Sequence, residues 1–289
     1  MKKKQRKQKL THRQRQDQRY AVPSRVTENA PSPNTQTEGI QAYLSVDTGE
    51  IFQPVRLYYR VAKSSQIVDR FLHLACMQFH PTYERWVWLL TGEATALPFQ
   101  HPTPSMNDAP VALGAWRVMK RMMVLDVFSC ERALQAIPFF ETYLPRKSAK
   151  LSHIGVINRL FAPDEFTEFH FDTSFRNDLQ FHDQSFWMLA KILWISLRTR
   201  NVHKRLALLE KSFHKQMHQS FPEVEYLPIR YYQEGVAALQ YQLTVRQNVA
   251  IHQWNGETEY SSHDYIEEVV QQYTTQHISS AKEGDNAHV

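Results

Sequence analysis

Apolar and polar residues alternate along the first half of the chain with the two-residue period that is typical of β-strands. The clearest example lies within residues 51–61, where one face of the expected strand carries Val55, Leu57, Tyr59 and Val61. The turn sequence Asp47-Thr48-Gly49 predicts a hairpin with residues 42–46. Further strands are expected at 86–90, 111–118, 122–127, 224–232, 236–245 and 250–254. Asn255-Gly256 would then form a second hairpin with 258–260.

Helical patterns alternate with these strands. Serines at 64 or 65 and at 129 are expected to cap two helices, and Pro138 is expected to kink or end the second one. Residues 185–197 are apolar on nearly every face and predict a buried central helix that Asp183 caps. Residues 203–218 predict an amphipathic helix, and residues 264–273 a last one. The inward residues of the amphipathic helix are expected to be Leu206, Leu209, Phe213 and Met217.

These elements predict an α+β fold with mainly antiparallel sheet segments, a central buried helix and an amphipathic helix, preceded by a disordered basic tail. Residues 1–38 hold few apolar side chains and several prolines, so a disordered tail and linker is expected there. Residues 39–160 are expected to form an α+β lobe. Residues 161–278 are expected to form a helical and then β lobe, either separate or in one domain with 39–160, and residues 279–289 are expected to be a disordered end.

Charge is distributed unevenly along the chain. The formal net charge is +5, yet nine of the 34 Lys and Arg residues lie within the first 19 residues, opposed there only by Asp17. Such a segment favours a polyanionic partner, because each cation that neutralises a phosphate releases a condensed counterion. The alternatives are a solubilising tail, or one that folds back on the acidic stretch at 257–268. An anionic membrane is disfavoured as a partner because the tail has no acyl or aromatic anchor. A cytoplasmic location is expected.

Several catalytic signatures are absent from the sequence. It contains neither of the common glycine-rich nucleotide loops, and no Gly-x-Ser-x-Gly elbow. His214 and His218 have the spacing of a zinc-protease motif, but Lys215 stands where the glutamate is required. Two cysteines exclude a disulfide framework and a four-cysteine zinc site. These absences favour a non-catalytic protein that needs no cofactor.

One histidine- and aspartate-rich region is the exception. Its candidate metal ligands are His153, His170, Asp172, His182 and Asp183. On an extended segment His170 and Asp172 would point the same way, and such ligands suit Mn, Fe, Zn or Mg. The second hypothesis is therefore a phosphohydrolase or nuclease that uses a divalent metal to activate water. The opposing interpretation is that these residues are helix caps and turn residues.

The order of these ligands is similar to that of a known family. His153, then the His182-Asp183 pair, then the distant Asp264 resemble the ligand order of the helical His-Asp phosphohydrolases. The resemblance covers four residues and implies a metal-bound water that attacks a phosphate ester.

A second basic region lies at residues 198–218, whose charged residues include six Lys and Arg and only one acid, Glu210. A solvated helix would show the same pattern. The leading hypothesis is a cytosolic, non-catalytic protein that binds nucleic acid or a ribonucleoprotein through phosphates. The residues expected to make these contacts are Lys2, Lys3, Lys4, Arg6, Lys7, Lys9, Arg13, Arg15, Lys204, Lys211 and Lys215. The third hypothesis is a scaffold or assembly factor whose acidic region 257–268 binds a basic protein.

Overall fold

The computed structural model describes residues 27–28, 43–99, 110–176, 202–229 and 235–285. Most of the expected basic tail, the expected buried helix at 185–197 and the end of the chain lie outside the described residues.

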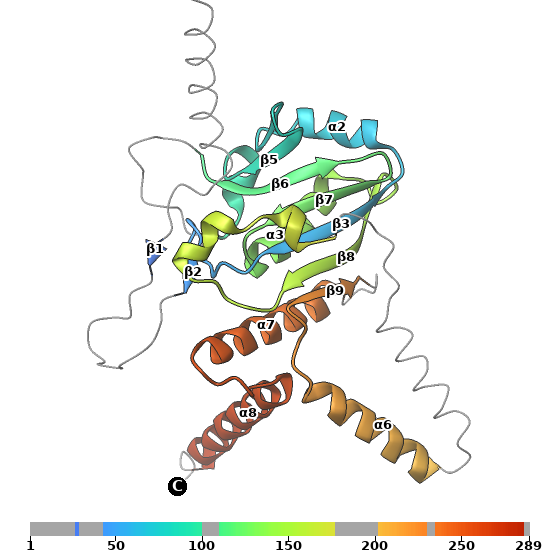
Figure 1. The fold of residues 1–289 in the computed structure, drawn as a ribbon. Coiled ribbons are helices and arrows are strands. Elements are labelled where there is room, and N and C mark those ends of the chain that lie inside the picture. The colour runs from blue at the N-terminus through green and yellow to red at the C-terminus, as the bar shows by residue number, and fades with distance from the viewer. Residues whose placement is uncertain (1–26, 29–42, 100–109, 177–201, 230–234, 286–289) are drawn as a thin grey trace, which may run out of the picture. The chain divides into compact units, whose positions relative to one another are not determined.

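An antiparallel sheet of seven strands forms the main element of the described structure (Figure 1). Its strands run in the spatial order β4-β5-β6-β7-β3-β8-β9, and every neighbouring pair is antiparallel. The α+β class with mainly antiparallel sheet is therefore confirmed. The strands are β3 (Val55–Val61), β4 (Met77–His80), β5 (Arg85–Leu89), β6 (Ala112–Val118), β7 (Met122–Val127), β8 (Ala149–Ile157) and β9 (Val224–Pro228). A separate short pair joins β1 (Thr27–Glu28) to β2 (Leu44–Ser45), and a single bridge joins Ser45 to Ile51.

One face of the sheet forms an aromatic core under two helices, α2 (Ser64–Leu72) and α3 (Cys130–Tyr143). Phe71 of α2 and Phe140 of α3 both pack against Trp116 of β6, with ring centroids 5.6 and 4.8 Å apart from it. Ser129 caps α3 as expected, because its hydroxyl accepts a hydrogen bond from the Arg132 backbone amide at 3.0 Å. The period-two apolar pattern of β3 and β7 therefore faces this core.

The opposite face is covered by the segment that follows β8. This segment contains the 3₁₀ helix η2 (Pro163–Glu168) and the short helix α4 (Phe171–Ser174). Phe171 and Phe175 are buried in an apolar cluster with Phe52 and Phe161. A further 3₁₀ helix, η1 (Gly92–Ala96), follows β5.

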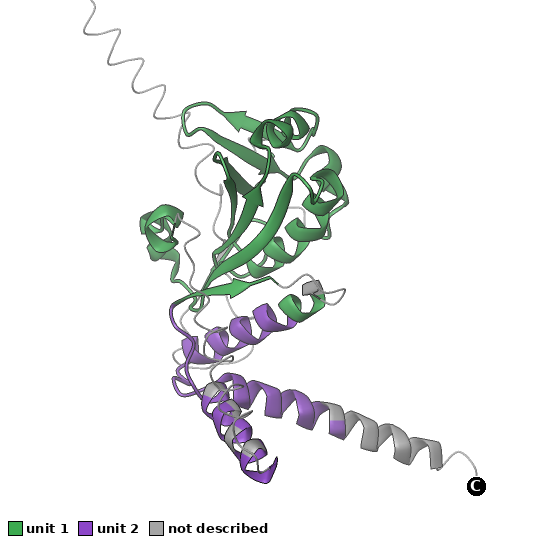
Figure 2. Cartoon of the chain, turned by 90° about the vertical axis from the view of Figure 1, so that its right-hand side faces the viewer, with its two compact units in different colours: residues 1–177, 224–240 green, residues 178–223, 241–289 purple. Residues whose placement is uncertain are grey.

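The chain divides into two compact units, shown in Figure 2. The first contains residues 1–177 and 224–240, and the second residues 178–223 and 241–289. The strand β9, which belongs to the expected second lobe, pairs with β8 in the first unit. The second unit holds α6 (Val202–Met217), most of α7 (Gly235–Trp254) and α8 (Ser262–Asp285). Its core cluster contains Val245, Val249 and Tyr260.

The predicted strands at 236–245 and 250–254 are wrong, because both lie in the helix α7. Leu239, Leu243, Arg246 and Ala250 are buried, and their spacing of three to four residues is that of a helix face. The predicted hairpin at Asn255-Gly256 is wrong as well. Gly256 has a φ of +97° and ends the helix, with the Glu257 amide bonded to the His252 carbonyl at 3.1 Å.

Pro138 does not end its helix, which was one of the two predicted outcomes, because α3 continues to Tyr143. Pro138 is exposed, so water can satisfy the carbonyl group that its missing amide leaves unbonded in the preceding turn. The helices expected near 64, 203–218 and 264–273 are present, and α8 continues to Asp285.

Candidate functional site

A network of charged side chains lies on the face of the sheet that carries η2 and α4. At its centre Arg56 of β3 pairs with Asp126 of β7, its neighbour across the two strands. Arg56 Nε donates to Asp126 Oδ1 at 2.5 Å and Nη2 donates to Oδ2 at 2.9 Å. The side chains of Arg56 and Asp126 are 0% and 3% exposed, so the two charges are buried as a bidentate pair.

Asp172 of α4 extends this pair into a larger cluster. Its carboxylate accepts hydrogen bonds from Arg56 at 2.9 Å, from Arg85 of β5 at 2.8 Å, and from Arg117 of β6. The cross-strand pairing of Trp86 with Trp116 turns these tryptophans into the apolar core and places Arg85 and Arg117 on the other face. We call Arg56, Arg85, Arg117, Asp126 and Asp172 the arginine cluster.

Aromatic rings enclose the buried part of the arginine cluster. The Arg56 guanidinium carbon lies 5.9 Å from the centre of the Phe171 ring and 5.6 Å from that of Phe175. Gly155 of β8 makes room for Phe175, because a Cβ atom at position 155 would lie 2.8 Å from the Phe175 ring. The packing of α4 thus depends on apolar contacts as well as on charge.

Mutual attraction favours the charged forms of Arg56 and Asp172, whereas complete burial raises the pKa of Asp126 against the opposing effect of Arg56. Burial alone lowers the pKa of Arg56, yet the hydrogen bonds and charge of Asp126 and the hydrogen bond of Asp172 raise it above its ordinary value. Partial burial raises the pKa of Asp172. The hydrogen bonds from Arg117 and Arg56 and the charges of Arg117 and Arg85 outweigh this effect and lower that pKa to about 2.

Sequence reasoning missed four members of the arginine cluster. The available signal was a charged residue inside an apolar strand: Arg56 within Val55–Val61 and Asp126 within Met122–Val127. Charged side chains are almost never fully buried unless they are paired, so each of these positions implied a partner. The cluster offers guanidinium donors in excess of carboxylates, and this chemistry suits the binding of an anion.

The proposed metal ligands are only partly described. His153 lies on β8, His170 precedes α4, and both carboxylate oxygens of Asp172 accept hydrogen bonds from arginines. No group of three His, Cys, Asp or Glu residues in the described part of the chain is placed to hold a metal ion. His182 and Asp183 lie outside the described residues. The expected extended geometry at 170–172 is wrong, because Asp172 stands in the first turn of α4.

The fourth residue of the resemblance to the helical His-Asp phosphohydrolases has a local structural role. Asp264 lies in the first turn of α8, where its carboxylate accepts hydrogen bonds from the Ser261 amide at 2.7 Å and the Ser261 hydroxyl at 2.6 Å. These bonds lower the pKa of Asp264. Two glutamates of the acidic region also have local partners: Glu257 pairs with His252, and Glu267 with His263.

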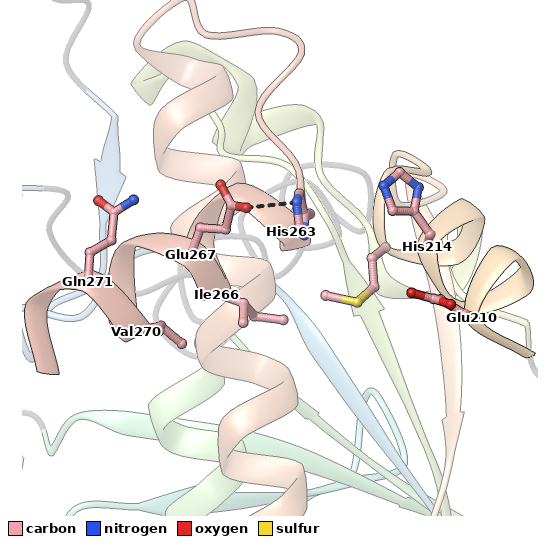
Figure 3. Close-up of a pocket in the computed structure, with 8 residues that line it drawn as sticks. Glu210, His214, His263, Ile266, Glu267, Val270 and Gln271 are labelled. Atoms are coloured by element: carbon pink, nitrogen blue, oxygen red, sulfur yellow. Dashed lines mark ion pairs between the residues drawn. The ribbon is translucent and has the colours of Figure 1, made fainter. Parts of the chain in front are cut away.

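The predicted basic helix is present as α6, and its three candidate lysines, Lys204, Lys211 and Lys215, are exposed. Their spacing places them along one stripe of the helix, which we call the lysine stripe. Another side of α6 faces α8 across a groove of about 490 Å³ (Figure 3). The groove is lined by Glu210, His214, Met217, His263, Ile266, Glu267, Val270 and Gln271.

Packing in this part of the second unit differs from the sequence expectation at one apolar position. Leu206 was expected to point inward, but it is 56% exposed. His218, just beyond α6, stacks on the His214 ring of that helix at 4.0 Å, and its ring lies tilted 4.2 Å from that of His263 of α8. The Ser262 hydroxyl also donates to the Met217 carbonyl at 2.8 Å.

None of the helices in the described ranges combines the length and the apolar run that crossing a bilayer requires. The candidate residues Lys2 to Arg15 lie outside the described residues. Comparison with protein-family models, with curated proteins and with solved structures finds no match for this chain. Any function must therefore be inferred from the residues themselves.

Proposed function

We propose that this protein is a non-catalytic binder of nucleic acid, alone or within a ribonucleoprotein, and that it contacts mainly phosphates. The observation that carries the proposal is the lysine stripe of α6, where Lys204, Lys211 and Lys215 are all exposed. A different side of the same helix lines the groove toward α8. The stripe thus remains accessible to an external partner while the helix is packed.

The N-terminal basic run supplies the second part of the proposal. Lys2, Lys3, Lys4, Arg6, Lys7, Lys9, Arg13 and Arg15 would add further phosphate contacts and increase the rate of encounter. Contacts of this kind position a protein on its partner but read no bases, so weak sequence preference is expected. DNA and RNA are separate arms of the test.

The test measures the affinity of the full chain for labelled DNA and RNA oligonucleotides of equal length by fluorescence anisotropy over a range of salt concentrations. Lys204→Gln, Lys211→Gln and Lys215→Gln are combined in one variant, and removal of residues 1–19 gives a second variant. The triple variant should lose about tenfold in affinity. Its salt slope should fall by about 2–3, because each phosphate contact contributes about 0.7–0.9.

A matched control removes the same charge elsewhere. Lys63, Lys120 and Lys150 are exposed lysines of the first unit, and their combined change to Gln should alter affinity by less than about twofold. An equal loss in both triple variants would show that net charge alone matters and would overturn the role of α6. Unchanged affinity and salt slope in the truncated protein would overturn the role of the tail.

A further inference from the structure

We propose that Arg85 and Arg117 form a binding site for a phosphate dianion, and that the carboxylate of Asp172 occupies this site as an internal competitor. The proposal concerns the sheet of the first unit, whereas the lysine stripe lies in the second. It therefore stands or falls independently of the nucleic-acid proposal.

The donors needed for a phosphate are present and accessible. Arg85 and Arg117 lie on the adjacent strands β5 and β6, and their side chains are 28% and 25% exposed. Within the described residues each donates a hydrogen bond to Asp172. A guanidinium carries five N–H donors, so each arginine has donors for a second acceptor. Arg56, in contrast, is fully buried and divides its bonds between two carboxylates.

The charges of the cluster also favour an added anion. Arg56 and Asp126 form a buried pair, and the other two arginines, Arg85 and Arg117, bond to Asp172, with Arg85 also 3.9 Å from the Asp126 carboxylate. When the carboxylate of Asp172 turns away, the two partly exposed guanidinium groups lose their hydrogen-bonded counter-charge, and the Asp126 carboxylate near Arg85 is already bonded to Arg56. Two planar forks from neighbouring strands match the geometry in which arginines bind phosphate.

Asp172 can give way without loss of the surrounding structure. Its side chain is 41% exposed, so a rotamer change takes the carboxylate into water. Phe171 and Phe175 remain buried and hold α4 against the sheet. Exposed ion pairs contribute little to stability, because water and salt screen them. An external phosphate can therefore compete with Asp172 for the two arginines.

The probe for the test is inorganic phosphate, titrated at low ionic strength and followed by NMR of the arginine side-chain N–H signals in the full chain. Asp172→Asn removes the competing charge and keeps the size of the side chain. This variant should bind phosphate at least about fivefold more tightly than the unchanged protein. In the same background, Arg117→Ala should weaken binding by about tenfold.

Two further variants separate binding from folding. Arg85→Lys and Arg117→Lys keep the charge but lose the planar fork, so both should fold and bind phosphate more weakly. Arg60→Ala is the matched control, because Arg60 is an exposed arginine of β3 outside the cluster, and it should change affinity by less than about twofold. Unfolding midpoints measured for each variant establish that the protein is folded.

The proposal is overturned if Asp172→Asn binds phosphate no more tightly than the unchanged protein, or if binding is indifferent to Arg85 and Arg117. A nucleoside 5′-monophosphate, compared with its nucleoside, distinguishes the source of the anion. Tighter binding of the monophosphate than of inorganic phosphate would indicate a nucleotide, and equal binding would indicate free phosphate. The combined changes at Lys204, Lys211 and Lys215 should leave phosphate binding unchanged, which keeps the two proposals distinguishable.

Discussion

The two faces of the seven-stranded sheet bury side chains in opposite ways. Trp88, Trp116 and Phe140 fill one face with aromatic rings under the helix α3, whose buried Arg132 pairs with Glu50. The other face buries Arg56 against Asp126 and places aromatic rings around the pair. The first face gains free energy from removing apolar surface from water.

Burial of charge follows a different rule. Removing two ions from water costs about as much as their attraction returns, so a buried ion pair is weak evidence for stability. Arg56 and Asp126 are direct partners in the register of β3 and β7, and Arg56 also bonds to Asp172 of α4. The aromatic face therefore stabilises the fold, whereas the face with the buried ion pair is suited to recognition.

The largest effect on stability is expected from removing one partner of the buried ion pair. Asp126→Ala should lower the free energy of unfolding by about 3–5 kcal/mol, because it leaves the Arg56 charge buried without its main partner. Equilibrium unfolding in urea measures this change. The double variant Arg56→Met, Asp126→Leu should recover most of the loss. A double variant as unstable as the single one would mean that the pair itself stabilises the fold.

On the aromatic face, Leu125→Ala is expected to lower the free energy of unfolding by about 3 kcal/mol. Leu125 is fully buried and lies on the strand next to Asp126, so the substitution leaves a cavity within the apolar core. Unfolding should show the same loss in low and high salt. A strong dependence of this loss on salt would contradict the proposed difference between the two faces.

Overpacking at Gly155 is expected to lower the free energy of unfolding by about 1–3 kcal/mol, because an added Cβ atom would lie 2.8 Å from the Phe175 ring. The substitution Gly155→Ala should displace Phe175 and loosen α4, which unfolding and the NMR signals of the Phe175 ring measure. Adding Phe175→Leu makes room and should restore part of the stability. If Phe175→Leu restores no stability, the loss in Gly155→Ala does not arise from contact with the Phe175 ring.

The smallest effect is expected from the partly exposed carboxylate, and it depends on pH. The pKa of Asp172 is about 2 in the folded protein, against about 3.9 for an unfolded aspartate. Its stabilising contribution is therefore fully present above about pH 4 and lost as the pH falls toward 2. The stability advantage of the unchanged protein over Asp172→Asn should disappear across this window, as measured by unfolding at a series of pH values. An advantage that grows on acidification would contradict the ion-pair geometry.

Sequence patterns predicted the parts of the fold that local interactions specify. The period-two strands β3, β6 and β7 and the Ser129 cap follow from alternation and from capping chemistry. The error at α7 arose from β-branched and aromatic residues, which resemble strands when they are read in short windows. The spacing of Leu239, Leu243 and Arg246 becomes a clear helical signal only over the whole segment.

The arginine cluster could not be predicted in the same way. Its members come from four strands and one short helix, and their proximity depends on the strand order and on the register of each pair. Sequence reasoning selected Asp172 as a metal ligand because the sequence does not reveal that three arginines donate hydrogen bonds to its carboxylate. Lys204, Lys211 and Lys215 were identified because one helix carries all three.

The position of β9 has a consequence for any shortened version of the protein. Residues 224–228 pair along β8, so a chain that ends near residue 177 would leave the backbone groups of β8 without their partner strand. The exposed edge would include the apolar residues Ile154, Val156 and Ile157, a sequence suited to pairing with other chains. Self-association of such a fragment, and its prevention when residues 224–228 are joined back through a short linker, would reflect an open sheet edge rather than an unstable core.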